Sequence, residues 1–208
     1  MELPWTDKAK TILYMGLSGQ AGGQAAANLL TGRVNPSGKL TETWPLSYAD
    51  AVSKKTFGKR NVEYREGIYV GYRHYDKADK PVHYPFGHGL SFSSFTYSDL
   101  LIDGRTIRFN ITNSGAVSDS EVVQLYISPP ETGLHRPRRE LKGFAKVYLM
   151  PGETKTIEME LNDRSFSVWS DGWEIPGGAY TVQSGASGRD ICLQTESKLN
   201  GEAVQIPK

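Results

Sequence analysis

The chain has 208 residues, enough for one large or two small domains, and its 38% hydrophobic and 23% charged residues are typical of a soluble globular protein. Its 24 Lys and Arg residues nearly balance its 23 Asp and Glu residues, and a net charge of +1 excludes the basic surplus of a nucleic-acid-binding protein. No apolar run approaches the roughly 18 residues of a membrane span. The single cysteine, Cys192, excludes an internal disulfide and a thiolate zinc site, and is compatible with a cytoplasmic or a secreted protein.

Residues 1–45 have the pattern of one α/β unit. The short apolar run at 11–17, bounded by glycine, predicts a buried strand. Residues 24–30 have high helix propensity and Gly32 is placed to end that helix, after which 39–45 are expected to be extended. One such unit cannot cover a sheet on both faces. We therefore expect residues 1–45 to be the C-terminal remnant of a larger α/β sandwich domain.

Residues 46–95 interleave ten tyrosine and phenylalanine residues with charged side chains. Partial alternation over 62–72 predicts a strand or a hairpin, whereas the prolines and glycines of 81–89 favour a long ordered loop over a helix. Loops of this length in compact proteins are usually functional or packed on a neighbour. We expect residues 46–95 to be an aromatic-rich linking loop.

From residue 96 onward the pattern is all β. About seven short strands separated by turn residues are typical of a fibronectin type III-like, or immunoglobulin-like, β-sandwich. The expected strands cover residues 95–102, 105–112, 121–128, 141–149, 154–161, 165–170 and 180–185. The sandwich is expected to span residues 96–193, and 194–208 a tail. The predicted fold class is therefore mainly β, with a partial α/β domain in front.

The familiar catalytic and ligand-binding motifs are incomplete in this chain. Ser18 lacks the G-x-S-x-G spacing of a hydrolase nucleophile, and the glycine-rich turn 19–23 lacks the Lys-Ser/Thr of a phosphate-binding loop. Cys192 lies between two apolar residues on an expected strand, so it is interpreted as a small core or surface residue and not as a nucleophile. The histidines show no metal-ligand spacing and are interpreted as hydrogen-bonded or exposed: His74, His83, His88 and His135.

Five residues in the aromatic segment are candidates for a position next to a substrate: Glu63, Tyr64, Arg65, Glu66 and Asp76. Carboxylates and guanidinium groups among aromatic rings are typical of surfaces that hold a polyol. The same residue types also pin loops in place through packing and charge-assisted hydrogen bonds, and this structural role is the alternative.

Two further surface features can each be interpreted in two ways. Trp169 and Trp173 would stack on sugar rings if the sandwich were a carbohydrate- or protein-binding module, and would otherwise anchor the sandwich. The basic run 136–139 is interpreted as a solvated loop, with an interdomain contact as the alternative.

Long ordered motifs run along most of the chain, at 19–30, 32–40 with Trp44-Pro45, 63–76, 84–92, 141–144, 149–153 and 178–182. Together they resemble the C-terminal portion of β-glucosidases of glycoside hydrolase family 3. The resemblance covers about residues 3–193. The chain departs from many members at Met15–Ser18, where they have an aromatic residue and a proline, and at Ala21, where they have glutamate; both are interpreted as subgroup variation.

The resemblance implies that the whole enzyme hydrolyses terminal β-linked sugars with retention, using two carboxyl groups about 5–5.5 Å apart and no cofactor. The family's aspartate nucleophile and glutamate acid/base lie upstream of the matched region, so no catalytic residue is expected in this chain. Glucoside, xyloside and arabinoside enzymes share this region. The implied partners are the barrel and the rest of the α/β sandwich domain, and a β-linked glucoside or oligosaccharide. A strand at 11–17 without neighbours would also favour self-association.

Overall fold

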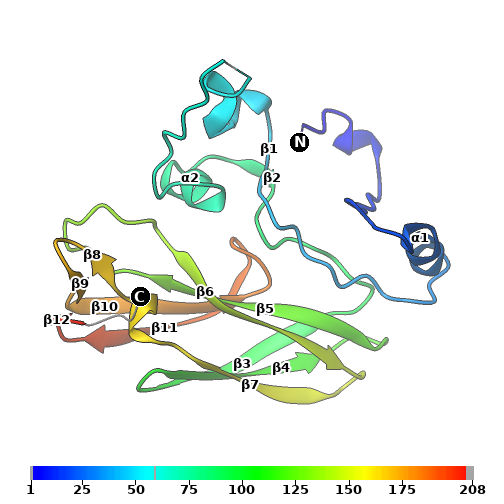
Figure 1. The fold of residues 1–208 in the computed structure, drawn as a ribbon. Helices are drawn as coiled ribbons and strands as arrows, with labels where there is room; N and C mark the ends of the chain where they lie inside the picture. The colour runs from blue at the N-terminus through cyan, green and yellow to red at the C-terminus, as the bar shows by residue number, and fades with distance from the viewer. Residues whose placement is uncertain (1, 59, 205–208) are drawn as a thin grey trace.

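The computed structural model describes residues 2–58 and 60–204, and its centre is a sandwich of two antiparallel sheets (Figure 1). The four-stranded sheet has the order β11-β10-β5-β6 and the three-stranded sheet the order β3-β4-β7. Their strands are β3 (Phe95–Asp103), β4 (Thr106–Asn113), β5 (Asp119–Ser128), β6 (Glu140–Leu149), β7 (Thr154–Glu160), β10 (Gly178–Gly185) and β11 (Ile191–Leu199).

The core lies between the two sheets, where alternating residues of each strand meet. On β4, every second side chain is buried, and Ile107, Phe109 and Ile111 face β5 residues such as Val123 and Leu125. Alternation with a period of two places successive side chains on opposite faces, which is why this pattern could be recognised in the sequence. The predicted mainly β fold class is confirmed.

The end of the sandwich differs from the expectation. Strand β11 pairs with β10 from Gly185↔Ile191 to Gly178↔Leu199, so the last strand continues beyond residue 193, where a tail was expected. Its sequence after Leu193 is mostly polar, because only one face contacts the core. The strand expected at 165–170 is reduced to Val168–Trp169, since a 3-10 turn occupies Asp163–Ser165.

Two small sheets complete the structure. The hairpin of β8 (Val168–Trp169) and β9 (Trp173–Ile175) pairs with β12 (Glu202–Ala203) at one end of the sandwich. Of the extended segment expected at 39–45, only β1 (Trp44–Pro45) is a strand, and it pairs with β2 (Val82–Tyr84). No helix in residues 2–58 and 60–204 combines the length and apolarity needed to cross a lipid bilayer.

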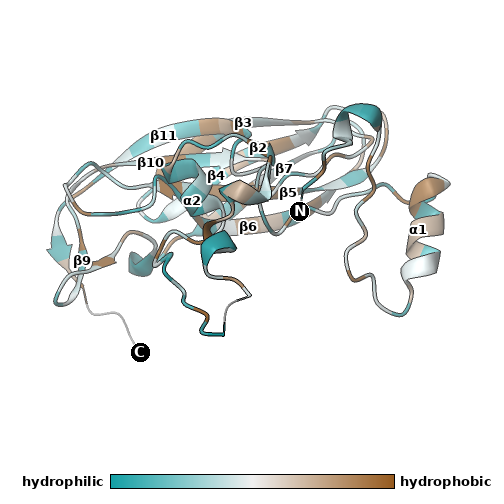
Figure 2. Cartoon of the chain, turned by 90° about the horizontal axis from the view of Figure 1, so that it is seen from above, coloured by the Kyte–Doolittle hydropathy of each residue, from teal (hydrophilic) through white to brown (hydrophobic). Residues whose placement is uncertain are grey.

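The N-terminal part contains the expected helix but not the expected strand. Helix α1 (Gly22–Leu30) is followed two residues later by Gly32, which has a φ of 70° and donates to the carbonyl of Leu29. The prediction of a strand at 11–17 is wrong, because within residues 2–58 and 60–204 no strand pairs with this segment, and Leu13, Tyr14 and Leu17 are exposed. Figures 1 and 2 show α1 standing apart from the sandwich.

The middle of the aromatic segment also differs from the expectation. The strand or hairpin expected at 62–72 is absent, because Gly67 and Gly71 adopt φ values of 57° and 56° that interrupt an extended strand. After Gly71 the chain forms the short helix α2 (Tyr72–Lys77), so the preference for a loop over a helix was wrong for these six residues.

The aromatic segment covers the outer face of the four-stranded sheet. The ring of Tyr72 stacks on Phe86 at 4.9 Å between centroids and meets Tyr126 of β5 edge-on at 6.2 Å. Gly87 has a φ of 81°, and a Cβ atom there would come within 2.2 Å of the Gln124 side chain. Glycine at 87 thus lets the segment lie close to the sheet.

Candidate functional site

The charged groups that join α2 to the sandwich form the most developed polar cluster in the described residues. Asp76 is buried at the end of α2, and its Oδ1 accepts a hydrogen bond of 3.1 Å from Nε of Arg189, in the β10–β11 loop. Its Oδ2 lies 3.7 Å from Nε of Arg139, in the loop before β6. Figure 1 shows the β10–β11 loop, in orange, rising toward the α2–β2 region.

Both arginines also donate hydrogen bonds to backbone carbonyl groups, one in the aromatic segment and one in the sandwich. Arg189 Nη2 donates to the carbonyl of Lys80 at 2.9 Å, and Arg139 Nη1 donates to the carbonyl of Gly188 at 3.1 Å. Bonds from charged donors are stronger than those between neutral groups. Asp76 is therefore fixed at the contact between the aromatic segment and the sandwich.

A cavity of about 250 Å³ opens beside this contact, lined by Asp76, Asp79, Arg138, Arg139 and Arg189. Arg138 and Asp79 form a second ion pair, with 3.7 Å between Nη1 and Oδ1, and both side chains are largely exposed. All five lining residues are charged, which distinguishes the cavity from the mostly apolar pockets that bind drug-like ligands.

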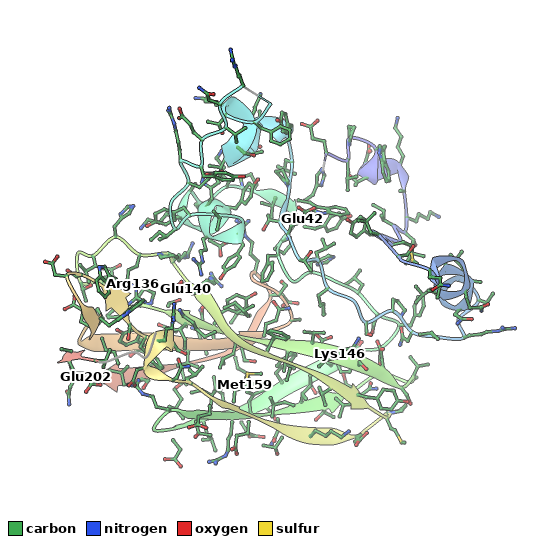
Figure 3. The ribbon with its side chains drawn as sticks, viewed as in Figure 1. Glu42, Arg136, Glu140, Lys146, Met159 and Glu202 are labelled. Carbon is green, nitrogen blue, oxygen red and sulfur yellow. The ribbon has the colours of Figure 1, made fainter. Side chains whose placement is uncertain are left out.

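A second charged joint is centred on Glu140 of β6 (Figure 3). Its carboxylate lies 3.0 Å from Arg73 of α2, 3.6 Å from Arg136 and 3.4 Å from Lys142. Burial lowers the pKa of Lys142 from its ordinary value, although the neighbouring Glu140 opposes the shift. Arg136 is buried and donates to the carbonyl of Phe166 at 3.1 Å, so the interpretation of 136–139 as a solvated loop was wrong for this residue.

The other substrate-adjacent candidates lie in a different environment from Asp76. Glu63 forms a surface ion pair with Arg65, and the Tyr64 side chain is 90% exposed. Glu66 has one carboxylate oxygen that is buried without a hydrogen-bond partner. Within residues 2–58 and 60–204, no hydrogen bond or ion pair connects residues 63–66 with Asp76. The structure thus separates residues 63–66 from Asp76, which lies in the buried contact with the sandwich.

A third charged contact, missed by sequence reasoning, ties the segment before β1 to β5. Lys39 Nζ lies 2.8 Å from Oε1 of Glu121, and both side chains are about nine-tenths buried. Lys39 also donates to the carbonyl of Gly89 at 3.1 Å. Burial raises the pKa of Glu121 above its ordinary value despite the attraction of Lys39.

The four histidines pack against aromatic rings. His74 contacts Tyr75, His83 and His88 stack on Tyr84, and His135 contacts Tyr69. In the part of the chain that the structure describes, no group of three or more His, Cys, Asp or Glu side chains could hold a metal ion.

Two of these histidines should make stability depend on pH. Burial first, and then the charges of Lys80 and Lys39, lower the pKa values of His74 and His88 below the unfolded value of about 6.5. The unfolded chain therefore binds more protons below that pH, and the free energy of unfolding should fall as the pH is lowered from 7.5 to 5.5. Urea titrations at the two pH values check this, and an unchanged midpoint would contradict it. In a variant with His74→Gln and His88→Gln, the difference in the free energy of unfolding between the two pH values should be smaller.

The tryptophan hairpin and the cysteine are the remaining features that the sequence singled out. Trp169 of β8 faces Trp173 of β9 edge-to-face at 5.6 Å, and the Trp169 side chain is 63% exposed. Arg164 lies over the ring of Trp173, which leaves Trp169 as the more accessible indole. Cys192 lies on β11 and is exposed, so of the two expected positions it takes the surface one.

The two halves of the chain match two family models. The model described as the glycosyl hydrolase family 3 C-terminal domain matches residues 1–92, and that of the fibronectin type III-like domain matches residues 121–188. The chain is 41% identical to thermostable beta-glucosidase B of Acetivibrio thermocellus over 100% of its own length, and 38% identical to an exo-alpha-(1->6)-L-arabinopyranosidase of Bifidobacterium longum over 98%. It spans 29% and 28% of those two relatives.

Solved structures are similar over the same extent. The Bifidobacterium adolescentis GH3 beta-glucosidase matches 99% of the chain with a TM-score of 0.91 and 40% identity, and the chain spans 32% of it. Beta-glucosidase 3B of Thermotoga neapolitana matches 99% with a TM-score of 0.92 and 38% identity, and the chain spans 30% of it. The chain belongs to glycoside hydrolase family 3, and corresponds to the C-terminal portion of its β-glucosidases.

Proposed function

We propose that this chain is the catalytically silent C-terminal part of a retaining β-glucosidase that hydrolyses terminal non-reducing β-D-glucosyl residues. The observation that carries the proposal is the match of 99% of the chain, at a TM-score of 0.92, to a β-glucosidase that was solved in complex with glucose. Because the chain spans about 30% of that enzyme, the remaining residues would supply the nucleophile and the acid/base.

The geometry of the described residues supports a bracing role. Three charged contacts join the segment before the sandwich to the sandwich itself: Asp76 with Arg139 and Arg189, Arg73 with Glu140, and Lys39 with Glu121. Paired groups of this kind hold two parts of a protein in one orientation. Glu63, Tyr64, Arg65 and Glu66 remain proposed as residues close to the substrate in the whole enzyme.

The reaction class can be tested with the whole protein that contains this chain. It should hydrolyse an aryl β-glucoside, and proton NMR should show the β-anomer of glucose as the first product, because retention proceeds through a covalent glycosyl-enzyme. An aryl α-L-arabinopyranoside is the matched alternative, since an arabinopyranosidase is 38% identical over this region. First release of the α-anomer would contradict the proposed mechanism, and activity on the arabinoside alone would contradict the proposed sugar.

We also propose the division of the chain into residues 1–45, 46–95 and an autonomous sandwich. The first part exposes apolar side chains, including Leu17 and Leu30, and the rest of the enzyme would cover them. The isolated chain is therefore expected to self-associate in light scattering. A monodisperse monomer for the full chain would contradict this assignment of residues 1–45.

A further inference from the structure

A second cavity, of about 390 Å³, opens where the N-terminal segment, the residues around β1 and helix α2 meet. Its walls include the side chains of Glu2, Glu42, Tyr48 and Tyr75. Among the described residues that line it, none is a lysine, arginine or histidine. The volume lies within the range of about 300–1,000 Å³ of pockets that bind small molecules. The cavity is thus large enough for a ligand, and its fixed charges are negative.

Both carboxylates are held in place by hydrogen bonds that use one of their two oxygens. Oε1 of Glu2 accepts from the backbone N–H of Tyr48 and, at 3.2 Å, from the hydroxyl group of Ser47. Oε1 of Glu42, which is labelled in Figure 3, accepts from Nε1 of Trp44 at 3.1 Å. Within residues 2–58 and 60–204, Oε2 of each glutamate accepts no hydrogen bond. Each carboxylate therefore keeps acceptor capacity available to a ligand.

The hydroxyl group of Tyr75 is a third unpaired group at this cavity. The side chain of Tyr75 is only 6% exposed, and a buried tyrosine usually has a partner for its hydroxyl group. Here the hydroxyl group forms no hydrogen bond within the described residues, yet it is not among the polar atoms that are closed off from solvent. Burial, and then the charges of Asp50 and Glu42, raise the pKa of Tyr75 above its ordinary value. The hydroxyl group is therefore neutral at pH 7, and its oxygen is free to accept a hydrogen bond in the cavity.

These groups select a cationic ligand with several N–H donors. Carboxylates accept hydrogen bonds but cannot donate them, and two carboxylates repel an anion. A neutral donor would leave both negative charges uncompensated, whereas an ammonium or guanidinium group supplies a positive charge together with several donors. The ring of Tyr48 already attracts one cation, since Nζ of Lys54 lies 5.9 Å from its centroid.

From this arrangement we infer that the cavity is a binding site for an ammonium or guanidinium group. The N–H groups of the ligand contact Oε2 of Glu2 and Oε2 of Glu42, and the oxygen of Tyr75 accepts a further hydrogen bond. Two sources carry this chemistry: a lysine or arginine side chain in the rest of the enzyme, and a free amine. Binding of the cation does not depend on which reaction the whole enzyme catalyses.

The test titrates ethylguanidinium into the 208-residue chain at constant ionic strength and follows proton–nitrogen NMR spectra. Two N–H groups report on the two carboxylates: Nε1–H of Trp44, bonded to Glu42, and the backbone N–H of Tyr48, bonded to Glu2. Both resonances should shift saturably, with the indole resonance assigned from a Trp44→Phe spectrum. Ethylurea has a similar shape without the charge and should cause no such shift.

Three variants separate this cavity from the rest of the surface. Glu42→Gln removes one charged acceptor at similar size and should weaken binding about ten-fold, as expected for the loss of a hydrogen bond between charged groups. Tyr75→Phe removes only the hydroxyl group and should weaken binding several-fold. Glu131→Gln, at an exposed position in the β5–β6 loop, should leave the Kd unchanged. No saturable shift, an equal shift with ethylurea, or a Kd unaffected by Glu42→Gln and Tyr75→Phe would overturn the inference.

The whole enzyme distinguishes the two sources of the cation. If a free amine binds, equilibrium dialysis with labelled ethylguanidinium should find a site that Glu42→Gln weakens. If a lysine or arginine side chain fills the cavity, that site is absent and Glu42→Gln should instead lower the urea midpoint. Neither effect would overturn the inference. Hydrolysis of an aryl β-glucoside is measured separately, so an active enzyme without either effect refutes this site alone, and an inactive enzyme that shows one of them refutes the proposed function alone.

Discussion

The 208-residue chain by itself is expected to release no nitrophenol from an aryl β-glucoside above the rate in buffer. Retaining hydrolysis requires a nucleophilic carboxylate and a proton donor about 5–5.5 Å apart, and the family supplies both from upstream of the matched region. Because enzymes of this kind accelerate reactions by at least about 10⁶-fold, the difference between the whole enzyme and this chain should be all-or-none.

A trace of contaminating enzyme is the main source of a false signal in this measurement. Turnover is therefore measured before and after repurification, and in the variant Glu66→Gln, which removes the carboxylate that has a buried, unpartnered oxygen. Turnover that persists on repurification and disappears in Glu66→Gln would show that the chain is a complete hydrolase, contrary to the proposed function.

The second large effect is expected from Lys39→Met, which breaks the buried ion pair with Glu121. The charge of Glu121 would remain in a desolvated position without its cation, and breaking such a pair costs about 3–5 kcal/mol of the free energy of unfolding. Burial already raises the pKa of Glu121, and loss of Lys39 should raise it further. The protonated carboxyl is the form that the folded state favours, so the loss of stability should be largest at neutral pH. It should diminish toward the unfolded pKa of about 4.3.

A double variant and an exposed pair give the controls for this prediction. Lys39→Met combined with Glu121→Leu leaves no uncompensated charge and should recover most of the lost stability, since hydrophobic replacement of a buried pair is often neutral. Arg108→Met removes an exposed partner of Glu158 and should change the urea midpoint little, because exposed ion pairs contribute little to stability. Urea titrations measure all three variants, and a similarly small loss for Lys39→Met would contradict the burial of this pair.

Strand alternation and turn residues are local properties, and they predicted much of the sandwich correctly. Strands such as β4 and β10 show a regular alternation of buried and partly exposed residues, which a reader of the sequence can count. Strand β11 was only partly recognised because its outer face is polar and few of its residues are apolar. The apolar run at 11–17 predicted a strand, but a strand forms only where a neighbour pairs with it.

The candidate site was only partly predictable. Asp76 was among the candidates, but its partner Arg189 lies 113 positions away in the chain, and no local pattern connects the two. Glu63 and Arg65 were grouped with Asp76 because they are close in sequence, whereas in the structure they pair with each other at the surface. Helix α2 begins after Gly71, which has a positive φ, and this helix places Asp76 against the sandwich.

The sequence by itself determined the family and the mainly β fold class, because long ordered motifs and a period of two can be recognised along the chain. Only the tertiary structure decided which charges are buried together, as in the contacts of Asp76 with Arg139 and of Lys39 with Glu121. The physical reason is that an ion pair depends on the distance between two side chains after folding. Burial then determines whether its loss is tolerated or costs several kcal/mol.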